Sequence, residues 1–307
     1  MNNFFQNYQT NFSVDAAKFL FRWYYAAAFY IVYSIARSFY VNFFLKESLL
    51  KKDFLLWPVA WLNFFNYTEA INFIFFFALA GTFLAMIFPE KRIFRIWCFL
   101  GIFEIIALVN SDGSTHDHAA YLWIPTSFLA IFLPDDWKQE GSFVKRRFSY
   151  IFWGCQAVIL LAYSMSGFGK LLHAFFQILD GEINLFSPYA GALHIADRLV
   201  RSPRFFSPIG GWLIEHYLVA WMFLLGTVYL EFFSFFVSFR PSVQRLWGAG
   251  LILFHVGIFL SMSPNFLYQI ILLTIFFLWT PIQKKWSIKD AFSDLPILGF
   301  FLRRMIR

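Results

Sequence analysis

The stretch from Phe148 to His173, FSYIFWGCQAVILLAYSMSGFGKLLH, decides the class of this protein. It carries no charged residue before Lys170, and an apolar run of roughly 20 residues is long enough to cross a bilayer core as a helix. Similar runs recur along the chain, which is 60% hydrophobic and only 14% charged, whereas soluble domains have roughly 25% charged residues. The sequence therefore predicts an all-α, polytopic integral membrane helix bundle.

About eight of these runs are predicted to be transmembrane helices. A further run, 54–65, is short and contains Pro58, so we expect it to lie in the interface or to re-enter the membrane. Residues 1–283 would then form one transmembrane domain, and 284–307 a basic amphipathic tail. The predicted spans cover 23–44, 68–88, 96–110, 119–134, 148–172, 217–239, 246–260 and 266–280.

The distribution of positive charge predicts the orientation. With eight spans, the side that holds the N-terminus collects 17 of the 25 lysines and arginines, and such an excess marks the cytoplasmic side. We therefore expect a bacterial inner (plasma) membrane protein with both termini in the cytoplasm. Short basic loops explain the net charge of +7 without a nucleic-acid partner, so membrane lipids are the expected surroundings.

The longest segment between predicted spans is 173–211, and it falls on the outer side in this arrangement. It contains an amphipathic piece, 192–200, between two Phe-Ser-Pro elements. Loops of this length inside a compact domain are often functional. We therefore expect an outward-facing pocket with 173–211 as its lid.

Lys170 is the first candidate for chemistry. Ser166, Lys170 and His173 lie at i, i+4 and i+7, on one face of a helix. Gly167 and Gly169 remove side-chain bulk and permit close approach of a helix or a ligand. A desolvated lysine gives up its proton more readily and can act as a base, whereas a lysine near the end of a span can also extend to the lipid headgroups. The residues alone leave both readings open.

Three further ionisable residues inside predicted spans are candidates for function, because a charge near a helix centre costs roughly 2.5–3.5 kcal/mol. They are Glu104, Glu231 and His255. Glu231 and His255 are both near mid-span and are expected to meet in the bundle, either as a proton relay or as a structural clamp.

Histidines also occur in the polar turn at His116-Asp117-His118. Two histidines at this spacing, without an HExxH motif or a His-Cys cluster, do not make a metal site. We expect instead that they line an outward-facing cavity. Cys98 and Cys155 lie inside apolar runs, which argues against a disulfide framework.

Several of these residues resemble the horizontally transferred transmembrane (HTTM) family, which includes the membrane part of vitamin K-dependent gamma-glutamyl carboxylases. The resemblance rests on short motifs between about residues 20 and 280. By this resemblance, Lys170 would stand where the carboxylases keep the base that deprotonates reduced vitamin K, with His118 and His255 as companions. The matching residues are Tyr163, Gly167-Phe-Gly-Lys170-Leu171, Phe186-Ser-Pro188, Glu231, Phe254-His255 and Pro264-Asn-Phe266-Leu-Tyr268.

Two functions from different classes remain open. The first is an enzyme-like site on a quinone-like or lipid-phase substrate, for which the resemblance implies a reduced vitamin K-type naphthoquinone. Its catalytic residues would be Lys170, His118 and His255, and its substrate-binding residues would be Ser166, His173, Glu231 and His116. The second is a non-enzymatic accessory protein for maturation or export of a secreted peptide, or for assembly with a partner membrane subunit.

Overall fold

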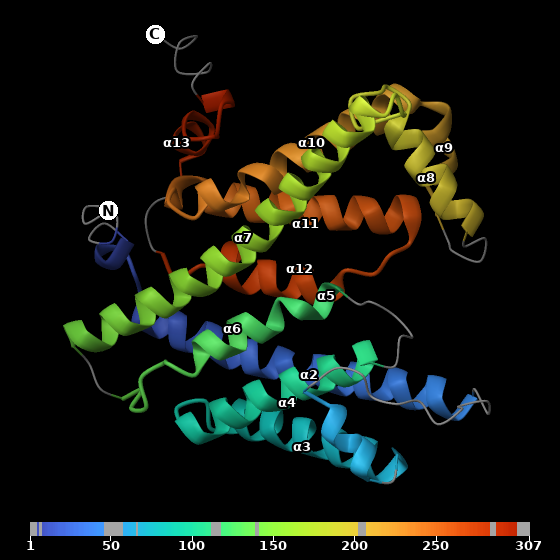
Figure 1. Ribbon diagram of the computed structural model, residues 1–307. Coiled ribbons are helices and arrows are strands. Elements are labelled where there is room, and N and C mark those ends of the chain that lie inside the picture. Colours follow the sequence, from blue (N-terminus) through green and yellow to red (C-terminus); the bar gives the residue numbers. More distant parts are fainter. Residues whose placement is uncertain are drawn as a thin grey trace. The chain divides into compact units, whose positions relative to one another are not determined.

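The computed structural model describes residues 5, 8–45, 58–65, 67–111, 118–138, 141–201, 207–282 and 287–299, and in these ranges the secondary structure is helical (Figure 1). The prediction of an all-α fold is confirmed. The chain divides into two compact units. The first comprises Met1–Cys155 with Thr280–Gln283, and the second comprises Gln156–Trp279 with Lys284–Arg307.

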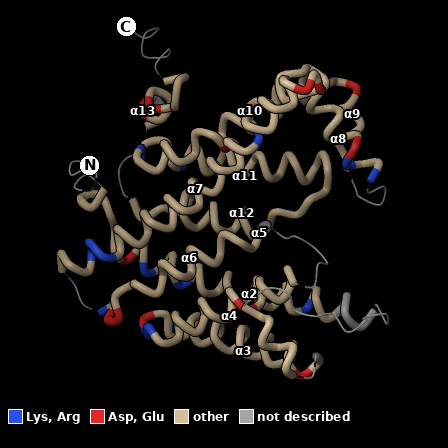
Figure 2. Tube along the Cα trace, viewed as in Figure 1, with Lys and Arg blue, Asp and Glu red and all other residues tan. Residues whose placement is uncertain are grey.

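Five helices in the described ranges are long and apolar enough to cross a membrane, and they correspond to the second, third, fifth, sixth and seventh predicted spans. In Figure 2, long stretches of the sixth and seventh predicted spans contain no charged residues. The five are α3 (Tyr67–Ile87), α4 (Arg92–Ser111), α7 (Ser142–Leu179), α10 (Tyr217–Val237) and α11 (Pro241–Met262).

α7 is longer than the sequence predicted. Its 38 residues extend over about 57 Å at 1.5 Å per residue, against a hydrocarbon core of about 30 Å. The helix continues past the predicted end at Leu172 as far as Leu179. Residues 173–179 therefore belong to this helix and not to the segment between spans, while the role of that segment as a lid stays a prediction.

The other three predicted spans take different forms. The first lies in α2 (Val14–Leu45), which has 32 residues but is not among the five. The fourth is divided into α5 (His118–Tyr121) and α6 (Trp123–Ala130). Pro125 lacks an N–H and its ring clashes with the carbonyl four residues earlier, so the break falls just after Tyr121.

The last predicted span changes helix type along its length. α12 (Leu267–Leu273) is followed by the π-helix η2 (Thr274–Leu278), with Trp279 as its C-cap. A π-turn displaces carbonyls from the regular ladder, and here the Gln156 side chain donates to the carbonyl of Phe276 at 2.6 Å. Of the 54–65 segment, the structure describes 58–65, where η1 (Ala60–Phe64) has only five residues.

In the first unit, one buried arginine joins two chain segments. The Arg95 side chain, at the start of α4, is 0% exposed. It binds the turn between α3 and α4 to the segment after α6, because both terminal nitrogens donate to main-chain carbonyls and one reaches Asp135 at 2.7 Å. The carbonyl acceptors belong to Pro89, Glu90, Ile131, Leu133 and Pro134.

In the second unit, two short helices pack beside α10 and α11. α8 (Ala190–Arg201) and α9 (Gly210–Glu215) form an apolar cluster with the start of α10. The amphipathic helix predicted over 192–200 is confirmed: α8 buries one face and exposes the other, which carries an Asp197–Arg201 ion pair. In the tail, residues 287–299 are described and contain α13 (Ile288–Ser293).

Candidate functional site

Two small residues hold α7 against α10. The Ser164 hydroxyl donates to the carbonyl of Phe232 at 2.9 Å and accepts from the N–H of Phe235 at 2.8 Å. A Cβ on Gly167 would lie 2.4 Å from the main-chain nitrogen of Phe232, so only glycine permits this approach. The close contact fixes the register of the two helices and brings the next turn of α7 to Glu231.

Lys170 and Glu231 form an ion pair across these helices. Lys170 Nζ donates to Glu231 Oε2 at 2.5 Å, and the Ser166 hydroxyl donates to Oε1 at 3.3 Å. The Glu231 side chain is 4% exposed and that of Lys170 is 40% exposed. Because an unpaired buried charge is costly, the ammonium group of Lys170 stabilises the buried carboxylate of Glu231. Lys170 is therefore directed to a carboxylate on α10 and is not simply extended towards lipid headgroups.

The expected pairing of Glu231 with His255 is wrong, because each has a different partner from α7. His255, on α11, is buried, and its Nε2 lies 2.5 Å from the hydroxyl of Tyr163. Tyr163 and Lys170 are seven residues apart and share one face of α7. α7 therefore supplies the partner of Glu231 on α10 and the partner of His255 on α11. The positions of Glu231 and His255 near the middle of their spans do not show this.

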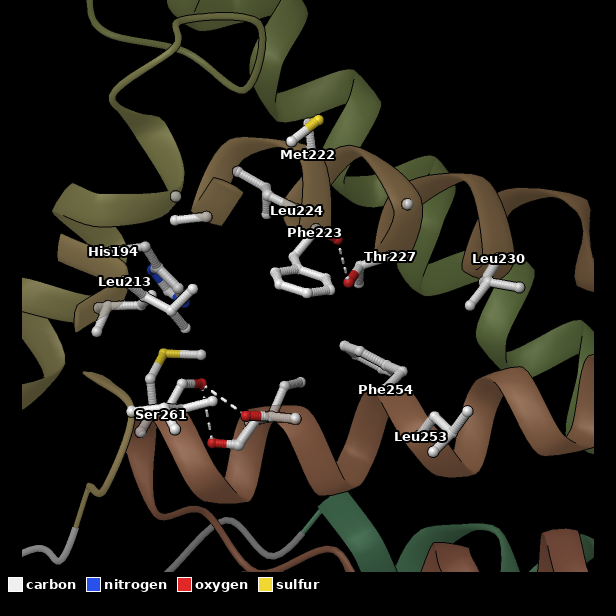
Figure 3. A pocket seen from close by; sticks show the side chains of 18 of the residues that line it. His194, Leu213, Met222, Phe223, Leu224, Thr227, Leu230, Leu253, Phe254 and Ser261 are labelled. Atoms are coloured by element: carbon white, nitrogen blue, oxygen red, sulfur yellow. Dashed lines mark hydrogen bonds between the residues drawn. The ribbon is translucent and has the colours of Figure 1, made fainter. Parts of the chain in front are cut away.

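Residues of α8, α9, α10 and α11 enclose an apolar cavity of about 570 Å³ (Figure 3). Lys170 lines it, with its amine 5.8 Å from the ring centroid of Phe254, within the range of a cation–π contact. The hydroxyls of Thr227 and Ser261 donate to carbonyls of their own helices, at 2.9 and 2.8 Å. Most of the wall therefore consists of apolar side chains from α10 and α11.

His194 is a site residue that the sequence reasoning missed. It lies on α8 and faces the cavity (Figure 3). The apolar surroundings lower the pKa of His194 by removing the ring from water, and the positive charge of Lys170 lowers it further. A neutral imidazole can both donate and accept a hydrogen bond. The sequence held one signal for His194: it lies in the amphipathic segment 192–200, which was expected near the pocket.

Of the other predicted site histidines, the structure describes the side chain of His173 alone. His173 is exposed on α7 and is absent from the described lining of the cavity. His116 lies outside the described residues, and of His118 only the main chain, at the start of α5, is described. Their proposed roles stay predictions. Among the described residues, no group of three or more His, Cys, Asp or Glu side chains is arranged to hold a metal ion.

No protein-family model, curated protein or solved structure matches this chain. Its function is therefore inferred from the ion pair, the Tyr163–His255 pair and the cavity that Lys170 lines.

Proposed function

We propose that this chain is an HTTM-like membrane protein whose second unit performs acid–base chemistry on a lipid-phase substrate. One observation carries the proposal: the amine of Lys170 touches a buried carboxylate and also lines an apolar cavity. Ionisable groups at membrane depth are expensive and usually functional. The five apolar helices support a substrate that arrives from the lipid phase.

The ion pair defines how Lys170 would act as a base. As it stands, Lys170 donates to Glu231, so the amine holds its proton. Movement of that proton to Glu231 Oε2, 2.5 Å away, leaves a neutral amine at the cavity and a neutral carboxyl bonded to Ser166. The amine then takes a proton from a substrate hydroxyl, within the usual reach of general-base catalysis. Tyr163, on the same face of α7 as Lys170, forms a second hydrogen-bonded pair with His255 of α11.

A quinone-like substrate fits this chemistry. The cavity volume of about 570 Å³ lies within the range of roughly 300–1,000 Å³ for small-molecule pockets. Its apolar wall suits a ring with a hydrocarbon tail, while Lys170 and His194 suit oxygen atoms on the ring. A reduced vitamin K-type naphthoquinone, the substrate class that the HTTM resemblance implies, combines these groups.

The test is deprotonation of a lipophilic naphthol with a prenyl tail, whose two protonation states differ in absorbance, in vesicles containing the protein. With protein in molar excess, the naphthol proton passes to the site, and the deprotonated fraction should rise about tenfold or more over empty vesicles. This corresponds to about one pKa unit, the lower end of the effect of an opposite charge beside an acidic group. Lys170→Met should abolish the increase. Lys170→Arg should retain binding but not the increase, because a guanidinium does not give up its proton.

Lys145→Met is the matched control, because Lys145 lies on α7 but outside the site. An unchanged increase in both Lys170 variants would refute the proposal. A stoichiometric protein partner after purification in gentle detergent, with no effect of Lys170 on the naphthol, would favour the accessory function instead.

We further propose that the protein has eight membrane spans, and that α2, the α5–α6 segment and the α12–η2 segment are the three beyond the five long apolar helices. Residues 54–65 lie at the interface or re-enter the membrane. Both termini lie in the cytoplasm of a bacterium. Support comes from the basic residues 145–147 at the start of α7 and from the overall excess of Lys and Arg on that side.

Thiol labelling of intact cells tests this orientation. A membrane-impermeant reagent should label Glu182→Cys, just after α7, because both the site and this residue should face outward. Phe143→Cys should react only after the membrane is permeabilised. Both residues are exposed, so accessibility in the fold is matched, and the reverse pattern would contradict the orientation.

A further inference from the structure

Two glycines keep part of the cavity open. Gly226 on α10 and Gly257 on α11 both line it, and a Cβ on either would meet no atom within 4 Å. Gly167 and Gly191 differ, because a Cβ there would lie 2.4 and 2.6 Å from the main chain of α10. Helix packing thus explains Gly167 and Gly191 but not Gly226 and Gly257. The space that these last two leave belongs to the cavity.

The wall around these glycines suits hydrocarbon. Leu253, Gly257 and Ser261 recur at intervals of four and share one face of α11. The Ser261 and Thr227 hydroxyls are already bonded within their own helices, and the hydroxyl of Tyr229, which also lines the cavity, donates to the carbonyl of Pro296. In the lining that the structure describes, Lys170 and His194 are the side chains that remain to receive a polar headgroup.

The glycines also lie close to the polar end of the cavity. The Lys170 amine is 5.8 Å from the ring centroid of Phe254, and Gly257 follows Phe254 by three residues, or about one helical turn. On α10, Gly226 lies about one turn before Leu230, which precedes the Lys170 partner Glu231. A chain attached to a headgroup at Lys170 would therefore reach both glycines within about one turn of helix.

We propose that the single apolar tail of the substrate lies between α10 and α11 across Gly226 and Gly257, and that these two residues set the size of the tail that is accepted. This inference rests on the proposed function, which assigns the headgroup to Lys170. It adds the place of the hydrocarbon tail and the residues that limit its size.

Binding to Gly226→Leu and Gly257→Leu tests the tail site. The probes are three naphthoquinones, with no tail, with one isoprene unit and with four, added to protein in lipid nanodiscs and followed by quenching of tryptophan fluorescence. Each variant is compared with the wild type for the same probe, so partition into the bilayer cancels. Leucine also favours a helix more than glycine does, so the substitutions should not unfold α10 or α11.

The expected result is unchanged affinity for the tailless probe and a loss of about tenfold or more for the four-unit probe in both variants, as for a crowded hydrophobic pocket. Gly211→Leu is the control. Gly211 is also a helical glycine with open space around it, but it does not line the cavity, so this variant should bind all three probes like the wild type.

Two results would overturn the inference while leaving the proposed function intact. One is wild-type affinity of both variants for the four-unit probe. The other is an equal loss of tailless and tailed probes, which would assign the headgroup to this space. If the wild-type protein binds none of the three probes, the proposed function itself fails, and the tail site fails with it.

Discussion

Replacing Lys170 with methionine is expected to lower the free energy of unfolding by about 3 kcal/mol, because Glu231 is then buried without its counter-charge. The Glu231 side chain is 4% exposed, and among the described side chains Ser166 would remain as its hydrogen-bond partner. Glu231→Gln is expected to cost only about 1 kcal/mol, as for one ordinary hydrogen bond. The lysine left behind is 40% exposed and can turn away from the interior.

The double variant separates the pair from its parts. The double variant Lys170→Met with Glu231→Gln should lose about 1 kcal/mol of unfolding free energy, since no uncompensated charge remains. Because the single losses add up to about 4 kcal/mol, the coupling energy between the two side chains is about 3 kcal/mol. Unfolding in mixed micelles of rising SDS content, followed by tryptophan fluorescence, measures all three variants. Additive single costs in the double variant would mean that the two side chains do not interact.

Arg95→Met is expected to cost about 4 kcal/mol, because it leaves several buried carbonyls without donors. The side chain of Arg95 is 0% exposed and donates to five carbonyls and to Asp135. Arg95→Lys should recover little of the loss, because an ammonium group cannot reproduce the planar fork of donors. The same SDS titration provides the measurement.

Arg92→Met is the matched control for Arg95, one turn away on α4. Arg92 is exposed, and its guanidinium lies 5.9 Å from the ring centroid of Phe132. Exposed contacts of this kind contribute about 0.5–1 kcal/mol. Similar losses for Arg92→Met and Arg95→Met would contradict the assigned role of the buried arginine.

The Glu231 contact changes the reading of Lys170. From the sequence, the lysine was either a base or a side chain that extends to the lipid headgroups. A carboxylate at 2.5 Å makes the resting group a proton donor in an ion pair, and basic behaviour then requires that Glu231 take the proton. This dependence explains why Lys170 and Glu231 have to be varied together.

The sequence by itself determined the class of the protein, five of the apolar helices and the amphipathic helix α8. Each of these depends on hydrophobic periodicity and run length, which act within one segment. The sequence also brought Ser166 and Lys170 onto one face of α7, because that follows from helical geometry alone.

Only the tertiary structure decided which groups meet. The partner of Glu231 is Lys170, that of His255 is Tyr163, and His194 reaches the cavity in place of His173. These pairings depend on how each helix is rotated and shifted against its neighbours, and the rotation is set by packing between segments far apart in the chain. For the same reason, the sequence does not distinguish Gly167 from Gly226. In the structure, Gly167 permits close packing of α10, whereas Gly226 leaves space in the cavity.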